Sequence, residues 1–93
     1  MVVGLLSVEL HIPGARSLKE KRMVLRGVKD RLKKFNVAVA EVEHQDLWQR
    51  AGLGIVTIGD STEFVDRALA TVADEIERTE PGLITGTQVE FLT

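Results

Sequence analysis

Four stretches of the chain have the composition of β-strands, and two longer stretches have the spacing of helices. The strand-like stretches are rich in β-branched residues or alternate between apolar and polar positions. They are Val2–Ile12, Val37–Glu43, Leu53–Ile58 and Leu83–Leu92. The helical stretches begin at capping sequences, Ser17-Leu18-Lys19-Glu20 and Asp60-Ser61, and run to about Lys34 and Arg78. The predicted order is βαββαβ.

The short segment between the two middle strands makes that pair antiparallel, and each helix must then cross over the sheet. Right-handed crossovers predict a ferredoxin-like α+β fold, one four-stranded antiparallel sheet with both helices on one face. We expect residues 1–93 to form one such domain, because 93 residues are too few for two.

Alternation assigns each strand residue to a face of the sheet. In the third strand we expect Gly52 and Gly54 to face inward with Val56 and Ile58, where the glycines would let a helix approach closely. The face without helices should then carry Leu5, Ser7, Glu9, His11, Val37, Val39, Glu41, Glu43, Leu53, Ile55, Gln88 and Glu90. This face has no central aromatic residue, which argues against base stacking on the sheet.

The segment His44–Arg50 is the densest group of hydrogen-bonding and aromatic side chains in the chain. We predict a single helical turn here, N-capped by Asp46, with Gln49 reaching back. A binding role for both residues is the open alternative. The only tryptophan, Trp48, is expected to close the end of the core, or else to be an exposed anchor for stacking or docking.

Charge is distributed unevenly although the formal net charge is only −2. Residues 15–35 contain nine basic and two acidic residues, a net charge of +7, whereas residues 60–80 have a net charge of −5. Five cations recur along one face of the first helix and form what we call the basic line: Lys19, Arg22, Arg26, Lys29 and Lys33. Such a line suits a polyanion, and the alternative is a solvated surface that balances the acidic second helix.

Composition excludes several classes of function. Without cysteine there is no disulfide, thiol nucleophile or zinc-thiolate site. No apolar run approaches the ~20 residues that span a bilayer, and the N-terminus lacks the features of a signal peptide, so we expect a cytoplasmic protein. We find no sequence motif for a nucleophile or a phosphate-binding loop, and Glu41 and Glu43 suit surface charges better than an acid–base pair.

Three segments carry a family resemblance: Val8 to Leu25 (VELHIPGARSLKEKRMVL), Phe35 to Val42 (FNVAVAEV) and Glu41 to Gly54 (EVEHQDLWQRAGLG). They resemble the YlxP-like family of small bacterial proteins that carry a domain of unknown function. The resemblance covers nearly the whole chain and implies a single ferredoxin-like domain. Genes of that family often lie near translation factors, which implies a ribosome-linked role. The family supplies no catalytic residues. Its motif positions here are Pro13, Gly14, Arg16, Ser17, Leu18, Lys21, Arg22, Gln45, Asp46, Trp48, Gln49 and Arg50.

Two weaker chemical hypotheses arise from the same region. The loop from Gly14 to Arg16 precedes a helix and resembles the anion-binding loop of acylphosphatases, which makes an acyl-phosphate hydrolase a minor alternative. His11 and His44 should meet at one edge of the sheet, where Glu43 or Asp46 would complete a set of metal ligands. We expect edge histidines that form hydrogen bonds, and no metal or cofactor.

We therefore predict a binding protein rather than an enzyme, associated with RNA or the ribosome. The residues expected to bind nucleic acid are Arg16, Lys19, Arg22, Arg26, Lys29, Lys33 and Arg50. Beside them at the sheet edge we expect the motif residues His11, His44, Gln45, Asp46, Trp48 and Gln49. The alternative is a homodimeric protein-interaction module that uses an apolar patch of Leu5, Val37, Val39, Leu53 and Ile55.

Overall fold

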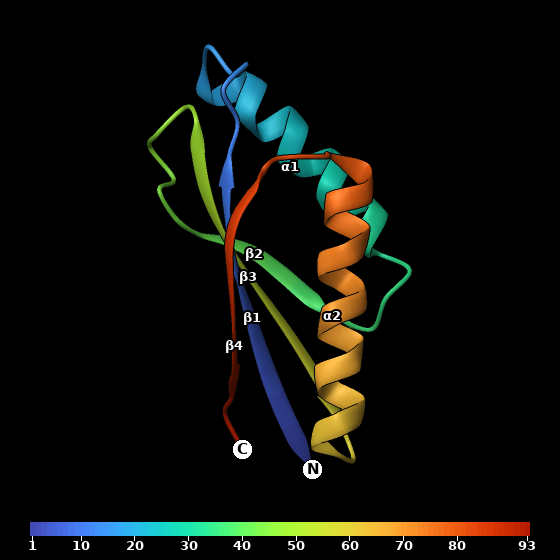
Figure 1. Cartoon of the computed structure of the whole chain (residues 1–93). Helices are drawn as coiled ribbons and strands as arrows, with labels where there is room; N and C mark the ends of the chain where they lie inside the picture. The colour runs from blue at the N-terminus through green and yellow to red at the C-terminus, as the bar shows by residue number, and fades with distance from the viewer.

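The computed structural model describes residues 1–93, the whole chain, and contains the six elements in the predicted order. They are β1 (Val2–His11), α1 (Leu18–Leu32), β2 (Ala38–Glu43), β3 (Arg50–Gly59), α2 (Thr62–Thr79) and β4 (Ile84–Phe91). The strands form one antiparallel sheet in the order β2-β3-β1-β4, and both helices lie on the same side of it (Figure 1). The predicted ferredoxin-like fold is confirmed.

Serine side chains cap both helices at their N-termini. The Ser17 hydroxyl accepts a hydrogen bond from the Glu20 backbone N–H at 3.1 Å, and the Ser61 hydroxyl accepts one from Phe64 N–H at 3.2 Å. Each bond satisfies one of the amides that a helix start leaves without a partner. Both caps lie where the sequence placed the helix starts.

The core lies between the sheet and the helices. Alternate residues of β1 are buried, Gly4, Leu6, Val8 and Leu10, and Ile12 just after the strand continues this inward face. The helices contribute Leu25, Val28, Leu32, Val65, Leu69, Val72 and Ile76. Their spacing of three and four residues is the amphipathic pattern from which the helices were predicted.

The face assignment was wrong for β3 and for β2 except at Glu43. Leu53 and Ile55 are only 1% and 0% exposed, and Val37 and Val39 pack against the same core. Leu53 pairs with Val8 of β1, whose side chain is also buried, so the two point to the same side. Of the five residues expected in the apolar patch, Leu5 alone lies on the open face of the sheet.

Two glycines on β3 face away from the helices, opposite to the prediction. A Cβ at Gly52 would lie 2.8 Å from the Glu43 Cβ, and one at Gly54 would lie 3.4 Å from the Val42 side chain. The register between β2 and β3 shifts between Glu41 and Glu43, which marks a β-bulge. The bulge places Val42 and Glu43 on the open face over these glycines, whereas Glu41 points toward α1.

The fold brings the functional candidates to one end of the molecule. The segment between β2 and β3 and the start of α1 lie at this end, and the two termini lie at the other (Figure 1). A backbone hydrogen bond joins the segment between β2 and β3 to the chain that leads from β1 to α1, since Ile12 N–H donates to the Gln49 carbonyl at 2.8 Å. Neither helix is long and apolar enough to cross a membrane.

Candidate functional site

A buried lysine organises this end of the molecule. Lys21 is 0% exposed, and its Nζ donates hydrogen bonds to three backbone carbonyls of residues 44–50. They are those of His44 at 2.9 Å, Arg50 at 3.2 Å and Gln45 at 3.4 Å. We call residues His44–Arg50 the 44–50 connection. Lys21 holds both of its ends against α1.

The charge of Lys21 is matched by Glu41, one of the acids predicted for the open face. The Glu41 Oε2 atom lies 2.8 Å from Lys21 Nζ, and the Glu41 side chain is only 15% exposed. The same oxygen is buried without a well-oriented hydrogen bond, because the three N–H groups of Lys21 serve the carbonyls. The contact is therefore mainly ionic, between two charges removed from water.

In the sequence Lys21 stood out only as one of nine basic residues and as a position of the family motif, yet its spacing distinguishes it. Leu18, Lys21, Leu25, Val28 and Leu32 follow one another at steps of three or four, so Lys21 occupies a position in the apolar stripe of α1. It also falls outside the basic line. A lysine in an apolar stripe signals a buried partner, and Glu41 shares the inward face with Val39.

The 44–50 connection contains no helical turn, so the predicted capping box is wrong. His44 has a positive φ of 59°, and its carbonyl accepts from Leu47 N–H at 3.0 Å, which closes a tight turn. Gln49 reaches across to the loop before α1, where its Nε2 donates to the carbonyls of Pro13 and Ala15, both at 3.2 Å. Long-range bonds, not local capping, set the shape of this segment.

Trp48 does not close the core. It is 55% exposed and faces a hollow of about 630 Å³. The hollow is also lined by His11, Asp46, Leu47, Gln49 and Arg50. Most of the motif residues predicted at the sheet edge therefore line one depression. The Trp48 ring is exposed, which agrees with the alternative prediction for this residue.

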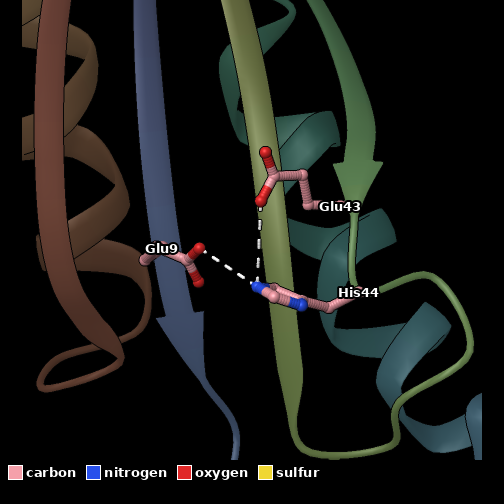
Figure 2. A group of neighbouring side chains, drawn as sticks. All are labelled: Glu9, Glu43 and His44. Atoms are coloured by element: carbon pink, nitrogen blue, oxygen red, sulfur yellow. Dashed lines mark hydrogen bonds and ion pairs between the residues drawn. The ribbon is translucent and has the colours of Figure 1, made fainter.

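His44 points instead into a second group on the open face of the sheet. Its Nε2 lies 3.1 Å from Glu9 Oε1 and 3.9 Å from Glu43 Oε2 (Figure 2). One imidazole and two carboxylates, with donor atoms within 4.8 Å of one another, are a set that a divalent transition metal can accept. His11 is not part of this group. Arg50 Nη2 lies 3.7 Å from Glu9 Oε2 and competes with any cation there, so the geometry supports an ion-pair network first.

The predicted anion-binding loop is already engaged within the chain. The Arg16 backbone N–H donates to the Glu20 carboxylate at 3.0 Å, and the Glu20 N–H donates to Ser17. Two of the amides that an anion would need are therefore in use. The side chain of Arg16 is exposed.

The basic line is exposed along most of its length. Within the line, the exposed side chains are Lys19, Arg22 and Arg26, and Lys29 is half-buried. Arg16, which precedes the line, is also exposed. No carboxylate oxygen lies within 4.0 Å of any of these five cationic groups. Arg22, Arg26 and Lys29 surround a hollow of about 260 Å³ with Glu41 at its edge. Lys33, by contrast, pairs with Asp30 at 3.2 Å.

Lys34, beyond the end of the basic line, is also neutralised. It pairs with Glu75 of α2 at 3.2 Å, and Arg78 pairs with the same carboxylate. Burial alone would raise the pKa of Glu75, but the hydrogen bonds and charges of Arg78 and Lys34 outweigh it and hold that pKa below its ordinary value of 4.5. This cluster ties the C-terminal half of α2 to the segment after α1.

Residues 3–89 match the family described as "Protein of unknown function (DUF503)". The chain belongs to this family. It is 39% identical over 85 residues to the uncharacterized protein YlxP of Bacillus subtilis (strain 168), covering 84% of this chain and 92% of YlxP. The predicted YlxP-like family is confirmed.

Two solved structures show the same fold at low identity. The de novo designed protein LFR1 1 with ferredoxin fold is 14% identical with a TM-score of 0.55, covering 100% of this chain and 87% of the designed one. The protein At3g17210 from Arabidopsis thaliana is 16% identical with a TM-score of 0.54, covering 100% and 94%. These likenesses concern the fold alone.

Removing the Lys21 ammonium should destabilise the protein. Lys21→Met leaves the Glu41 charge and three carbonyls without their partner, and we expect a loss of roughly 3–5 kcal/mol in the free energy of unfolding. Urea denaturation measures it. Lys19→Met, on the exposed face of the same helix, should change stability by less than about 0.5 kcal/mol. Adding Glu41→Gln to Lys21→Met should recover part of the loss. A Lys21→Met variant with the unfolding free energy of the wild type would contradict this role.

Acid should weaken the Glu75 cluster. Because the folded-state pKa of Glu75 is lowered, its contribution to stability is complete above its ordinary pKa of 4.5 and is lost as pH falls through the folded value. The free energy of unfolding should therefore fall more steeply between about pH 6 and pH 3 in the wild type than in Glu75→Gln. Equal slopes in urea titrations of the two proteins would refute this.

Proposed function

We propose that the chain is a single-domain RNA-binding accessory protein of the cytoplasm, which associates with the ribosome through the exposed cations of α1. The observation that carries the proposal is a row of five cations without a carboxylate partner: Arg16, Lys19, Arg22, Arg26 and Lys29. Surface cations usually gain little from pairing, but a row left free keeps its full charge for an external anion.

The geometry of the row favours a chain of phosphates over a small anion. Positions 19, 22, 26 and 29 are spaced by three and four residues, so their side chains follow one face of the helix for about 15 Å. Lysine and arginine along such a line each neutralise about one phosphate and release counterions. Nucleic acid is the polyanion of this shape, and the ribosome-linked role implied by the resemblance makes ribosomal RNA the first ligand to test.

Two members of the predicted nucleic-acid set contribute less. Lys33 is paired with Asp30, and Arg50 lies beside Glu9. The open face of the sheet is an unsuitable RNA surface, because it carries Glu9, Glu43 and Glu90. RNA would therefore lie along α1 and not across the open face of the sheet.

RNA binding should depend steeply on salt. For five phosphate contacts on a single strand, log K should fall with log salt with a slope of about −3.5. Arg26→Glu should weaken binding on the order of tenfold at low salt and make the slope shallower by about 1 or more. Fluorescence anisotropy with a labelled fragment of ribosomal RNA measures both.

Arg67→Glu is the matched control for this experiment. Arg67 is exposed on α2 and lies in the acidic helix, so the same change of charge there should leave RNA affinity nearly unchanged. A flat response to salt, or equal effects of the two substitutions, would refute the proposal.

A second candidate function is self-association through the open face of the sheet. Val42 and Ile58 are 54% and 49% exposed, and Leu5 and Val56 lie beside each other on that face. These residues replace the apolar patch expected from the sequence. The expected result is a dimer in sedimentation equilibrium that Val42→Asp dissociates, and a monomer at millimolar concentration would refute it.

A further inference from the structure

The exposed tryptophan at the same end of the molecule as the start of α1 requires an explanation that the fold does not supply. A buried tryptophan is among the largest hydrophobic contributions a small domain can gain. Here Trp48 is 55% exposed, and leucine, isoleucine and valine fill the core instead. More than half of the Trp48 surface is therefore available to contact a ligand.

The backbone that carries Trp48 is also held in place. The residues that flank it are fixed on both sides, by the turn that His44 closes with Leu47 and by the two hydrogen bonds of Gln49 to the loop before α1. Lys21 binds the carbonyls at each end of the 44–50 connection. A rigid aromatic side chain loses little conformational entropy on binding.

The hollow beside Trp48 has the composition of a nucleobase site. Its volume of about 630 Å³ lies in the ~300–1,000 Å³ range of small-molecule sites. It is lined by two aromatic residues on which bases stack, Trp48 and His11, and by Arg50, whose guanidinium lies 3.7 Å from Glu9. Asp46 and the side-chain oxygen of Gln49 add hydrogen-bond acceptors suited to base edges, since the Gln49 amide N–H groups already bind Pro13 and Ala15.

Its position connects it to the basic line. Gln49 bonds to the loop that contains Arg16, and Lys21 in the first turns of α1 bonds to the 44–50 connection. The hollow therefore lies at the same end of the molecule as the start of α1, and Gln49 links it to the loop that leads to Arg16. A strand whose phosphates follow α1 can place a base there only if that base is unpaired.

We propose that the RNA ligand is single-stranded at this end and that one unpaired base stacks on Trp48. The inference rests on the proposed RNA-binding function and specifies its ligand. Duplex RNA keeps its bases stacked on one another and offers only phosphates and hydroxyls, so it would use α1 without occupying the hollow.

Because Trp48 is the only tryptophan, its fluorescence reports on the hollow alone. We expect an unstructured oligoribonucleotide to quench this emission on binding, and inorganic polyphosphate, which has no bases, to bind without quenching. Trp48→Ala should weaken binding of the single strand roughly 5- to 150-fold, the equivalent of ~1–3 kcal/mol for one stacked base. Trp48→Phe should retain part of the affinity, and the affinity for a matched RNA hairpin should stay within about twofold.

Phe64→Ala is the control, since Phe64 is a comparably exposed ring, 51%, on α2. Unchanged circular dichroism and thermal unfolding show that each variant is folded. If RNA binds and Arg26→Glu weakens it, but Trp48 emission and Trp48→Ala affinity do not change, the stacking inference is overturned and the proposed function stands. Tighter binding to the hairpin than to the single strand also overturns the inference. Absence of all RNA binding overturns both.

Discussion

The arrangement of this end of the molecule depends on a single cation without access to water. An ammonium group buried without partners is too costly to remain charged, so every group around Lys21 must satisfy it. Three carbonyls and one carboxylate do so. The carbonyls belong to the 44–50 connection, whose last residue begins β3, and the carboxylate belongs to Glu41 of β2. The position of α1 over the sheet and the path of the 44–50 connection therefore depend on the same need, which is to surround the Lys21 charge with acceptors.

The fold could be predicted from the sequence because its signals agree with one another. The helix caps, the helical spacing of apolar residues and the alternation along the strands all indicate the same six elements. The faces of β3 could not be assigned in this way, because Leu53 and Ile55 on one side are as apolar as Val56 and Ile58 on the other. Gly52 and Gly54 were the residues that distinguish the two faces, and they were wrongly expected to face the helices. They make room for side chains of β2 at a bulge, and a bulge inserts one residue that alternation alone does not reveal.

The candidate site was predictable in its location and not in its geometry. Strand order alone brings the loop before α1 next to the 44–50 connection. The shape of that connection follows from bonds between residues more than 20 positions apart, such as Lys21 to His44 and Gln49 to Pro13, and from a left-handed backbone at a residue other than glycine. Local rules such as the capping box describe none of these. The outward position of Trp48 follows from them.

The unequal helices have a consequence for how the molecule moves toward a charged surface. α1 carries the free cations, whereas α2 exposes Glu63, Asp66, Asp74 and Glu77. A body with separated charges experiences a torque in an electric field, so near a negatively charged surface it turns its positive side forward before any contact forms. A protein of net charge −2 would then be attracted in one orientation and repelled in the opposite one. Whether an approach to the surface ends in contact would then depend on the orientation of the molecule as well as on its distance.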